Sequence, residues 1–166
     1  MQNLRVLKTL INFTGVGGTL LFSPPLRTKD TSLRRQRDAD FFAAYVKAIQ
    51  EHDFVSQSEA INYVRCNQAP KFYIDWNFCS AVIGRMLKGM PTGLKGEQRH
   101  RKFEQLYKMF LEERSKPGNE NLSQKEICYR IVDMPAPEFY INYRAASGII
   151  SEQRRLKQEE MMRWVR

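Results

Sequence analysis

Two long stretches of the chain share one order of apolar and polar positions at a constant spacing. The first covers residues 56–83 and the second covers residues 123–150. Each opens with Ser-Gln-x-Glu, continues with apolar residues at helical spacing, passes through Ala-Pro-x-Phe-Tyr-Ile and ends in a second apolar-patterned segment. A pattern that recurs in this way indicates an internal repeat, and it predicts two copies of one structural unit.

The opening of each copy predicts the start of a helix. Serine followed three residues later by glutamate is a capping box, in which the hydroxyl accepts a first-turn N–H and the carboxylate reaches back. We therefore expect helices that begin at Ser56 and Ser123. The first should end near Asn67, and the second near Met134, because Pro135 cannot continue a helix.

We interpret the Ala-Pro-x-Phe-Tyr-Ile segment as an extended connector. Its Phe and Ile side chains are expected to anchor it to the core. Asp75 and Asn142 follow it at matching positions, and both are favourable N-cap residues. We expect each of them to begin another helix, over about residues 76–88 and 143–162. Because the same type of N-cap residue recurs at one position in both copies, we expect each copy to fold as a helix, a connector and a second helix.

An apolar stripe at helical spacing also precedes each copy and predicts helices over residues 34–50 and 99–113. Its matched residues are Phe41/Phe103, Tyr45/Tyr107 and Ile49/Leu111. The predicted fold is therefore all-α: a tandem duplication of a three-helix, helix-turn-helix-like unit with an N-terminal arm or short hairpin. The expected segments are an arm and linker (1–33), unit 1 (34–88), a linker (89–98) and unit 2 with an extended C-terminal helix (99–166).

The first 22 residues have a pattern of their own. Basic Arg5 and Lys8 precede an apolar run that three glycines interrupt, which faintly resembles a secretory signal. The run is too short and too rich in glycine to span a membrane, so no membrane span is predicted. An arm or a hairpin around Gly15–Gly18 is the favoured interpretation.

Charge and cysteine content narrow the class of partner. The chain has 27 Lys and Arg against 18 Asp and Glu, a net charge of +9, which favours a polyanionic partner: DNA, with RNA as the alternative. The cysteines Cys66, Cys79 and Cys128 are widely spaced and odd in number, so we expect packing residues rather than disulfides or a metal site. A reducing, cytoplasmic location is the corresponding expectation.

Catalytic and cofactor motifs are missing from the sequence. It has no glycine-rich phosphate loop with lysine, no HExxH and no GxSxG, so an enzyme is not expected. His52 and His100 have no second histidine at ligand spacing, and neither is expected to bind a metal. No cofactor is predicted.

The tandem three-helix arrangement resembles that of helix-turn-helix DNA-binding modules, over about residues 34–157. In such modules one helix crosses the DNA backbone and the next lies in the major groove, with its N-terminal part at the base edges. The helices that begin at Asp75 and Asn142 would take that second role. Their candidate base-reading residues are Asn77, Ser80, Arg144, Ser147 and Ser151.

Arginines and lysines elsewhere are candidate phosphate contacts. They are Arg34, Arg35, Arg37, Arg85, Lys88, Arg99, Arg101, Lys102, Arg154, Arg155 and Lys157. The expected function is DNA binding in a regulatory or architectural role. The alternative is a structural or adaptor protein whose helical repeats hold a protein partner. Separately, the N-terminal arm or the C-terminal helix is a candidate contact for a protein partner or a homo-oligomer.

Overall fold

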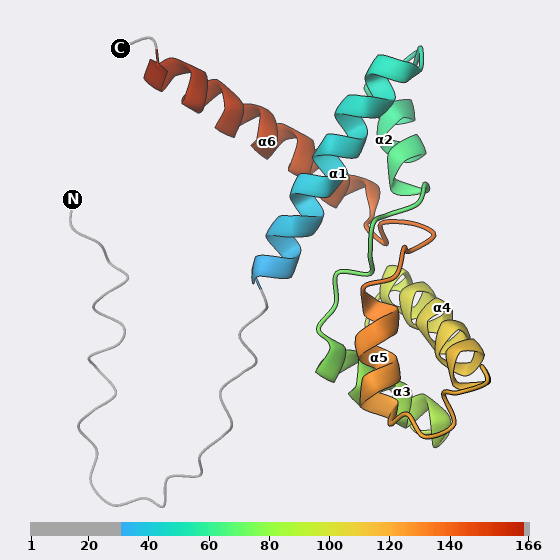
Figure 1. Cartoon of the computed structure of the whole chain (residues 1–166). Helices are drawn as coiled ribbons and strands as arrows, with labels where there is room; N and C mark the ends of the chain where they lie inside the picture. Colours follow the sequence, from blue (N-terminus) through green and yellow to red (C-terminus); the bar gives the residue numbers. More distant parts are fainter. Residues whose placement is uncertain (1–30, 165–166) are drawn as a thin grey trace, which may run out of the picture.

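The computed structural model describes residues 31–164, and this part of the chain is helical without a β-strand (Figure 1). The helices are α1 (Thr31–Glu51), α2 (Gln57–Arg65), α3 (Trp76–Leu87), α4 (Glu97–Arg114), α5 (Gln124–Val132) and α6 (Tyr143–Trp164). The predicted all-α class is confirmed over this range. Of the arm and linker predicted for residues 1–33, residues 1–30 lie outside the described part, and residues 31–33 belong to α1.

The predicted serine caps begin α2 and α5. At Ser123 the full capping box is present: the hydroxyl accepts from Glu126 N at 3.3 Å, and the Glu126 carboxylate accepts from Ser123 N at 2.7 Å. At Ser56 the hydroxyl accepts from Glu59 N at 3.2 Å. The Glu59 carboxylate reaches Val55 N instead, at 2.9 Å, so this cap is only half of a box.

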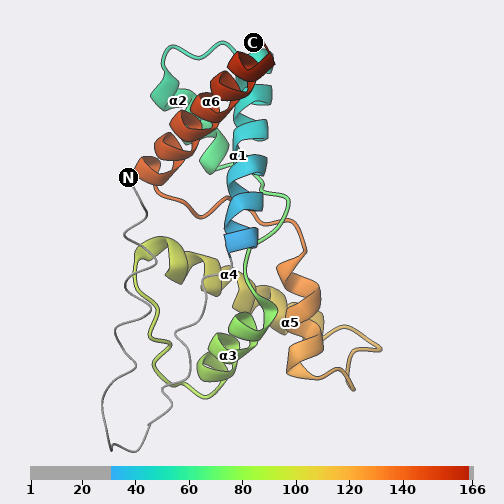
Figure 2. The same cartoon turned by 90° about the vertical axis from the view of Figure 1, so that its left-hand side faces the viewer.

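The six helices pack as two three-helix bundles whose members are not consecutive in the chain. One bundle contains α1, α2 and α6, and the other contains α3, α4 and α5, as Figures 1 and 2 show. The helix after each connector therefore packs on the other half of the chain. A helix-turn-helix would pack α3 on α2, whereas here α3 packs on α4 and α5, so the tandem duplication of a three-helix unit stays a prediction.

The two connectors pair with each other where they cross. Ala69 and Ala136 exchange backbone hydrogen bonds, at 2.8 Å from Ala69 N to Ala136 O and at 2.9 Å in return. Phe72 N donates to Val132 O at 3.1 Å, and its counterpart Phe139 N donates to Arg65 O at 3.2 Å. Because each connector bonds to the other one, each carries its next helix across to the opposite bundle.

Buried aromatic rings fix the crossing. Phe72 and Phe139 are 1% and 2% exposed, and the Phe139 ring meets the Phe41 ring edge-on at 5.2 Å between centroids. The residues that follow them, Tyr73 and Tyr140, have φ angles of 49° and 52°. Such left-handed backbone is uncommon for tyrosine and costs about 1–2 kcal/mol per residue. The packing of the rings offsets this cost at the same position of both connectors.

The second half of α6 continues beyond its bundle, and Figure 1 shows it projecting from the side of α1. Every residue from Arg154 to Arg163 is exposed. Arg155 pairs with Glu152 at 2.7 Å and also with Glu159, and such pairs stabilise a helix without tertiary packing. Among residues 31–164, none of the helices combines the length and apolar character that crossing a membrane requires.

Candidate nucleic-acid interface

Asp75 and Asn142 begin α3 and α6 as predicted. The Asp75 carboxylate accepts from Phe78 N at 2.9 Å, and the Asn142 amide oxygen accepts from Ala145 N at 2.8 Å. First-turn N–H groups and the helix dipole make a helix start favourable for anions such as phosphate. The start of α6, which the neutral Asn142 caps, keeps this property, whereas the Asp75 carboxylate already places a negative charge at the start of α3.

The first half of α6 leaves one face uncovered. Arg144, Gly148 and Ser151 follow one another at helical spacing, and all three are exposed. A Cβ built at Gly148 would meet no other atom within 4 Å, so nothing in the described chain covers this point. Ser147 is partly buried, and its carbonyl accepts from the Ser151 hydroxyl at 3.1 Å. The face is thus small and open at its centre, with an arginine at its start.

The face of α3 at the matching sequence positions is partly covered by α5. Asn77 is exposed, as a base-reading residue must be, but Ser80 is only 7% exposed. The side-chain amide of Gln124 on α5 donates to the Ser80 carbonyl at 2.6 Å and to its hydroxyl at 3.1 Å. Burial and these hydrogen bonds leave little of Ser80 available for a base edge.

Gly84 accounts for this difference between α3 and α6. A Cβ at Gly84 would lie 3.0 Å from Nε2 of Gln124, so the glycine leaves room for the amide to reach α3. In the second copy of the repeat, Ser151 stands at the position of Gly84, and Gln57, which matches Gln124, is exposed. Sequence reasoning passed over Gly84 and Gly148; a glycine inside a helical pattern was the available signal.

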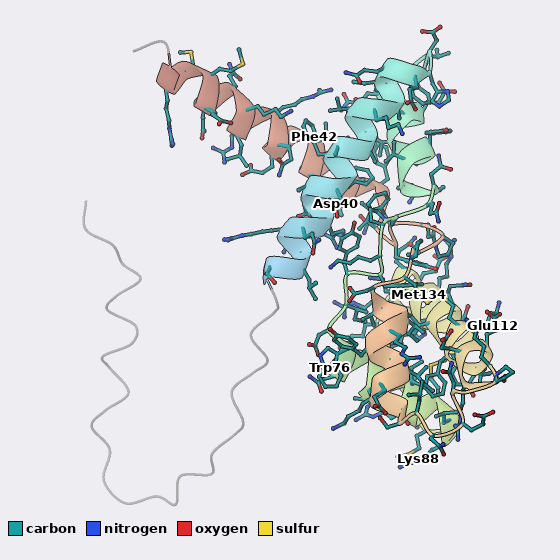
Figure 3. All side chains as sticks on the ribbon, viewed as in Figure 1. Asp40, Phe42, Trp76, Lys88, Glu112 and Met134 are labelled. Carbon is teal, nitrogen blue, oxygen red and sulfur yellow. The ribbon has the colours of Figure 1, made fainter. Side chains whose placement is uncertain are left out.

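Arg85 and Lys88 lie toward the C-terminal end of α3. Figure 3 labels Trp76 and Lys88 at its two ends. Arg85 is exposed, and its guanidinium donates to the Thr92 carbonyl of the following loop at 3.4 Å. Lys88 is the exposed C-cap residue. Both remain compatible with phosphate contact.

Three basic residues of α6 are engaged within the chain. Arg154 donates to the Tyr45 hydroxyl at 3.2 Å, and Lys157 Nζ lies 4.9 Å from the ring centroid of Phe42, which Figure 3 labels on α1. Arg155 is paired with two glutamates, of which Glu152 raises the pKa of its guanidinium most. Arg154 and Lys157 therefore help to dock α6 on α1, and Arg155 supports the projecting end.

The basic start of α1 is partly neutralised by its own helix. Arg34 and Arg37 both contact Asp38, at 3.8 Å and 2.6 Å. Arg35 is exposed and takes part in none of the ion pairs found within residues 31–164. Arg35 is thus the α1 arginine best placed for a phosphate.

The basic start of α4 lies against the connectors. Arg101 pairs with Glu138 at 2.8 Å, and Lys102 Nζ donates to the Phe72 carbonyl at 3.1 Å. Burial, and then the charges of Arg37 and Arg99, lower the pKa of Lys102 to about 8. Lys102 thus lies within electrostatic range of Arg37 on α1 and of Arg99 on α4. The structure also gives Lys102 a structural contact in place of the predicted phosphate contact, while Arg99 stays exposed.

Other candidate chemistry is sparse in residues 31–164. Cys79 and Cys128 are buried, as packing residues should be, whereas Cys66 is exposed. No group of His, Cys, Asp or Glu in this range is arranged to hold a metal ion. A pocket of about 360 Å³ beside Cys66 and Tyr140 is lined by two basic and two acidic side chains, Arg101, Lys108, Glu104 and Glu138, so it selects neither sign of charge.

Comparison of the chain with protein-family models, with curated proteins and with solved structures gave no match.

Proposed function

We propose that this chain binds duplex DNA through the open face of α6, with α3 as a second contact. In this proposal the chain is a tandem duplication of a three-helix unit whose third helices are exchanged. The observation that carries it is the uncovered stripe of Arg144, Gly148 and Ser151 in the first half of α6. The major groove of duplex DNA admits an α-helix, and polar side chains on the helix face that enters it can reach base edges.

The stripe has suitable chemistry for base contact. An arginine can pair bidentately with guanine, and a serine hydroxyl can donate or accept. Gly148 between them would let the helix backbone approach the DNA closely. The positions that match on α3 are Asn77, Ala81 and Gly84, and asparagine can pair bidentately with adenine.

The basic residues that remain exposed supply phosphate contacts in this proposal. Arg35 at the start of α1 and Arg99 at the start of α4 are exposed, as are Arg85 and Lys88 on α3. The net charge of +9 adds a general attraction to a polyanion. The role would be regulatory or architectural.

The second candidate is an adaptor that binds a protein. The observation that favours it is the group of exposed apolar and aromatic side chains, with Tyr129 60% exposed and packed edge-on against Trp76. Met161 and Met162 on the projecting end of α6 are also exposed, at 70% and 63%. Aromatic residues and methionine are enriched in protein interfaces.

The test is a titration of a fluorescent duplex with the purified chain over a range of salt concentrations. DNA binding predicts an affinity that falls steeply with salt. Arg144→Ala should weaken binding by about 1–3 kcal/mol, or roughly 5- to 150-fold, while Lys125→Ala, an exposed lysine on α5, should have little effect.

A second variant tests the face itself. Gly148→Glu places a carboxylate on the open stripe where no other atom obstructs it, so folding should be preserved. It should reduce binding more than Gln50→Glu, which adds the same charge at an exposed position on α1. Equal affinity of the two variants, together with a salt-independent Kd, would favour the adaptor.

A further inference from the structure

The hydrogen bonds at the connector crossing occur in matched pairs. The bond from Ala69 N to Ala136 O is matched by the bond from Ala136 N to Ala69 O. The bond from Phe72 N to Val132 O is matched by the bond from Phe139 N to Arg65 O, with every residue replaced by its counterpart in the repeat. Reciprocal bonding of this kind is what a two-fold rotation between the connectors produces.

The helix packing has the same symmetry. Under this rotation α1 is exchanged with α4, α2 with α5 and α3 with α6, and the two bundles then have the same composition. Figures 1 and 2 both show α3 and α6 running in opposite directions on either side of the crossing. A rotation by half a turn reverses directions perpendicular to its axis and preserves direction along it. The antiparallel α3 and α6 therefore lie across the axis, and matching faces that are directed along the axis turn toward the same side of the molecule.

These faces carry matched but unlike residues. On α3 the order is Asn77, Ala81, Gly84, Lys88, and on α6 it is Arg144, Gly148, Ser151, Arg155. Each begins with a residue capable of bidentate base contact, continues with small residues and ends with a basic residue. The two faces differ in access, because Gln124 of α5 lies against Gly84 while Gly148 is uncovered. Asparagine suits adenine and arginine suits guanine, so the two helices would prefer different bases.

We infer, on the basis of the DNA binding proposed above, that one chain reads a duplex site of two half-sites in inverted orientation. Duplex DNA has two-fold axes of its own, and proteins with two-fold symmetry bind inverted half-sites about one helical turn apart. Here both reading helices belong to one chain, so a single copy covers the site. The half-sites are unlike: α6 requires guanine through Arg144, and α3 requires adenine through Asn77.

The experiment is a selection of duplexes from a random library by the full-length chain, followed by sequencing. The expected result is a motif of two inverted elements, one containing an essential guanine and the other an essential adenine. Arg144→Ala should remove the preference in the guanine element alone, and Asn77→Ala the preference in the adenine element alone. A single uninterrupted motif, a direct repeat, or loss of both elements in either variant would overturn the inference.

Stoichiometry and geometry give an independent readout on the selected duplex. Native mass spectrometry should show one chain per duplex, and two chains per duplex would overturn the inference. Reversing one element at unchanged spacing should weaken binding as much as scrambling that element, by roughly 10-fold or more for two or more lost base contacts. Equal affinity for the inverted and the direct arrangement would contradict the proposed symmetry.

The outcomes separate this inference from the proposed function. Salt-dependent binding that enriches no motif would overturn the two-element site and leave DNA binding intact. Failure to retain any duplex at low salt would overturn DNA binding itself, and the inference with it.

Discussion

The two bundles share one arrangement but hold their third helices differently. In the bundle of α3, α4 and α5, the Gln124 amide bonds to Ser80. In the bundle of α1, α2 and α6, the matching Gln57 is exposed, and Arg154 binds the Tyr45 hydroxyl instead. Residues at matching sequence positions thus serve packing in one bundle and stay accessible in the other. The accessible set, on α6, is therefore the better candidate for recognition.

The tyrosines of the two connectors also contact different residues: Asp40 of α1 in one case and Lys102 of α4 in the other, at matching sequence positions. Asp40, labelled in Figure 3, accepts from the Tyr73 hydroxyl at 2.6 Å, and burial and then this bond raise the pKa of Tyr73. Lys102 instead lies over the Tyr140 ring, 5.7 Å from its centroid. Charges of opposite sign thus accompany the same backbone geometry, which indicates that the packing of the aromatic rings sets it.

The largest effect should come from the rings that both connectors share. Phe72→Ala and Phe139→Ala should each lower the free energy of unfolding by about 3–5 kcal/mol, because each leaves a cavity at the crossing. Urea unfolding followed by circular dichroism measures both. A loss below about 1 kcal/mol for either variant would show that the crossing is not part of the core.

Substitution of the matching glutamines, Gln124 and Gln57, should change the free energy of unfolding by different amounts. Gln124→Ala removes two hydrogen bonds and leaves Ser80 buried without them, so it should cost about 1–3 kcal/mol. Gln57→Ala changes an exposed side chain and should stay within about 0.5 kcal/mol. Equal losses of unfolding free energy, measured by urea unfolding, would mean that the two glutamines contribute equally to helix packing.

Lys102 should make stability depend on pH. Its folded pKa of about 8 lies below the ordinary 10.5, so between these values the unfolded chain binds more protons than the folded chain. Stability should therefore rise as pH rises through this window, by about 1 kcal/mol between pH 7 and pH 9 relative to Lys102→Met. Parallel stability profiles of the two proteins over this range, from urea unfolding, would contradict the burial of Lys102.

The smallest effect concerns the two serine caps. Ser123→Ala and Ser56→Ala should each cost about 1 kcal/mol, because each removes the hydroxyl that accepts from a first-turn N–H. The two losses should be similar, since the carboxylates of Glu126 and Glu59 bond to backbone N–H groups that the substitutions leave in place. Thermal melts of the two variants measure both losses, and a silent Ser123→Ala variant would show that this hydroxyl does not cap α5.

The helices and their caps could be predicted from the sequence because they depend on local order. Ser56, Ser123, Asp75 and Asn142 all begin helices where the pattern placed them. The packing of α3 on α4 and α5, and of α6 on α1 and α2, could not be predicted in this way. It depends on contacts between residues distant in sequence, among them the pairing of the connectors at Ala69 and Ala136.

The candidate site was predictable in part. Exposure of Arg144 and Asn77 follows from the apolar periodicity of their helices. The loss of Ser80 to Gln124 and the burial of Lys102 depend on contacts between residues that are distant in sequence. A repeat pattern also hides such differences, because it suggests that matching residues have matching surroundings.

The packing of α3 on α4 and α5, and of α6 on α1 and α2, underlies the inferred symmetry, and one NMR measurement tests it directly. The Gln124 side-chain amide protons should show nuclear Overhauser effects to Ser80 and Gly84 on α3. A sample that mixes labelled and unlabelled chains should show that these contacts arise within one chain. Contacts between α2 and α3 in place of these would contradict the two bundles.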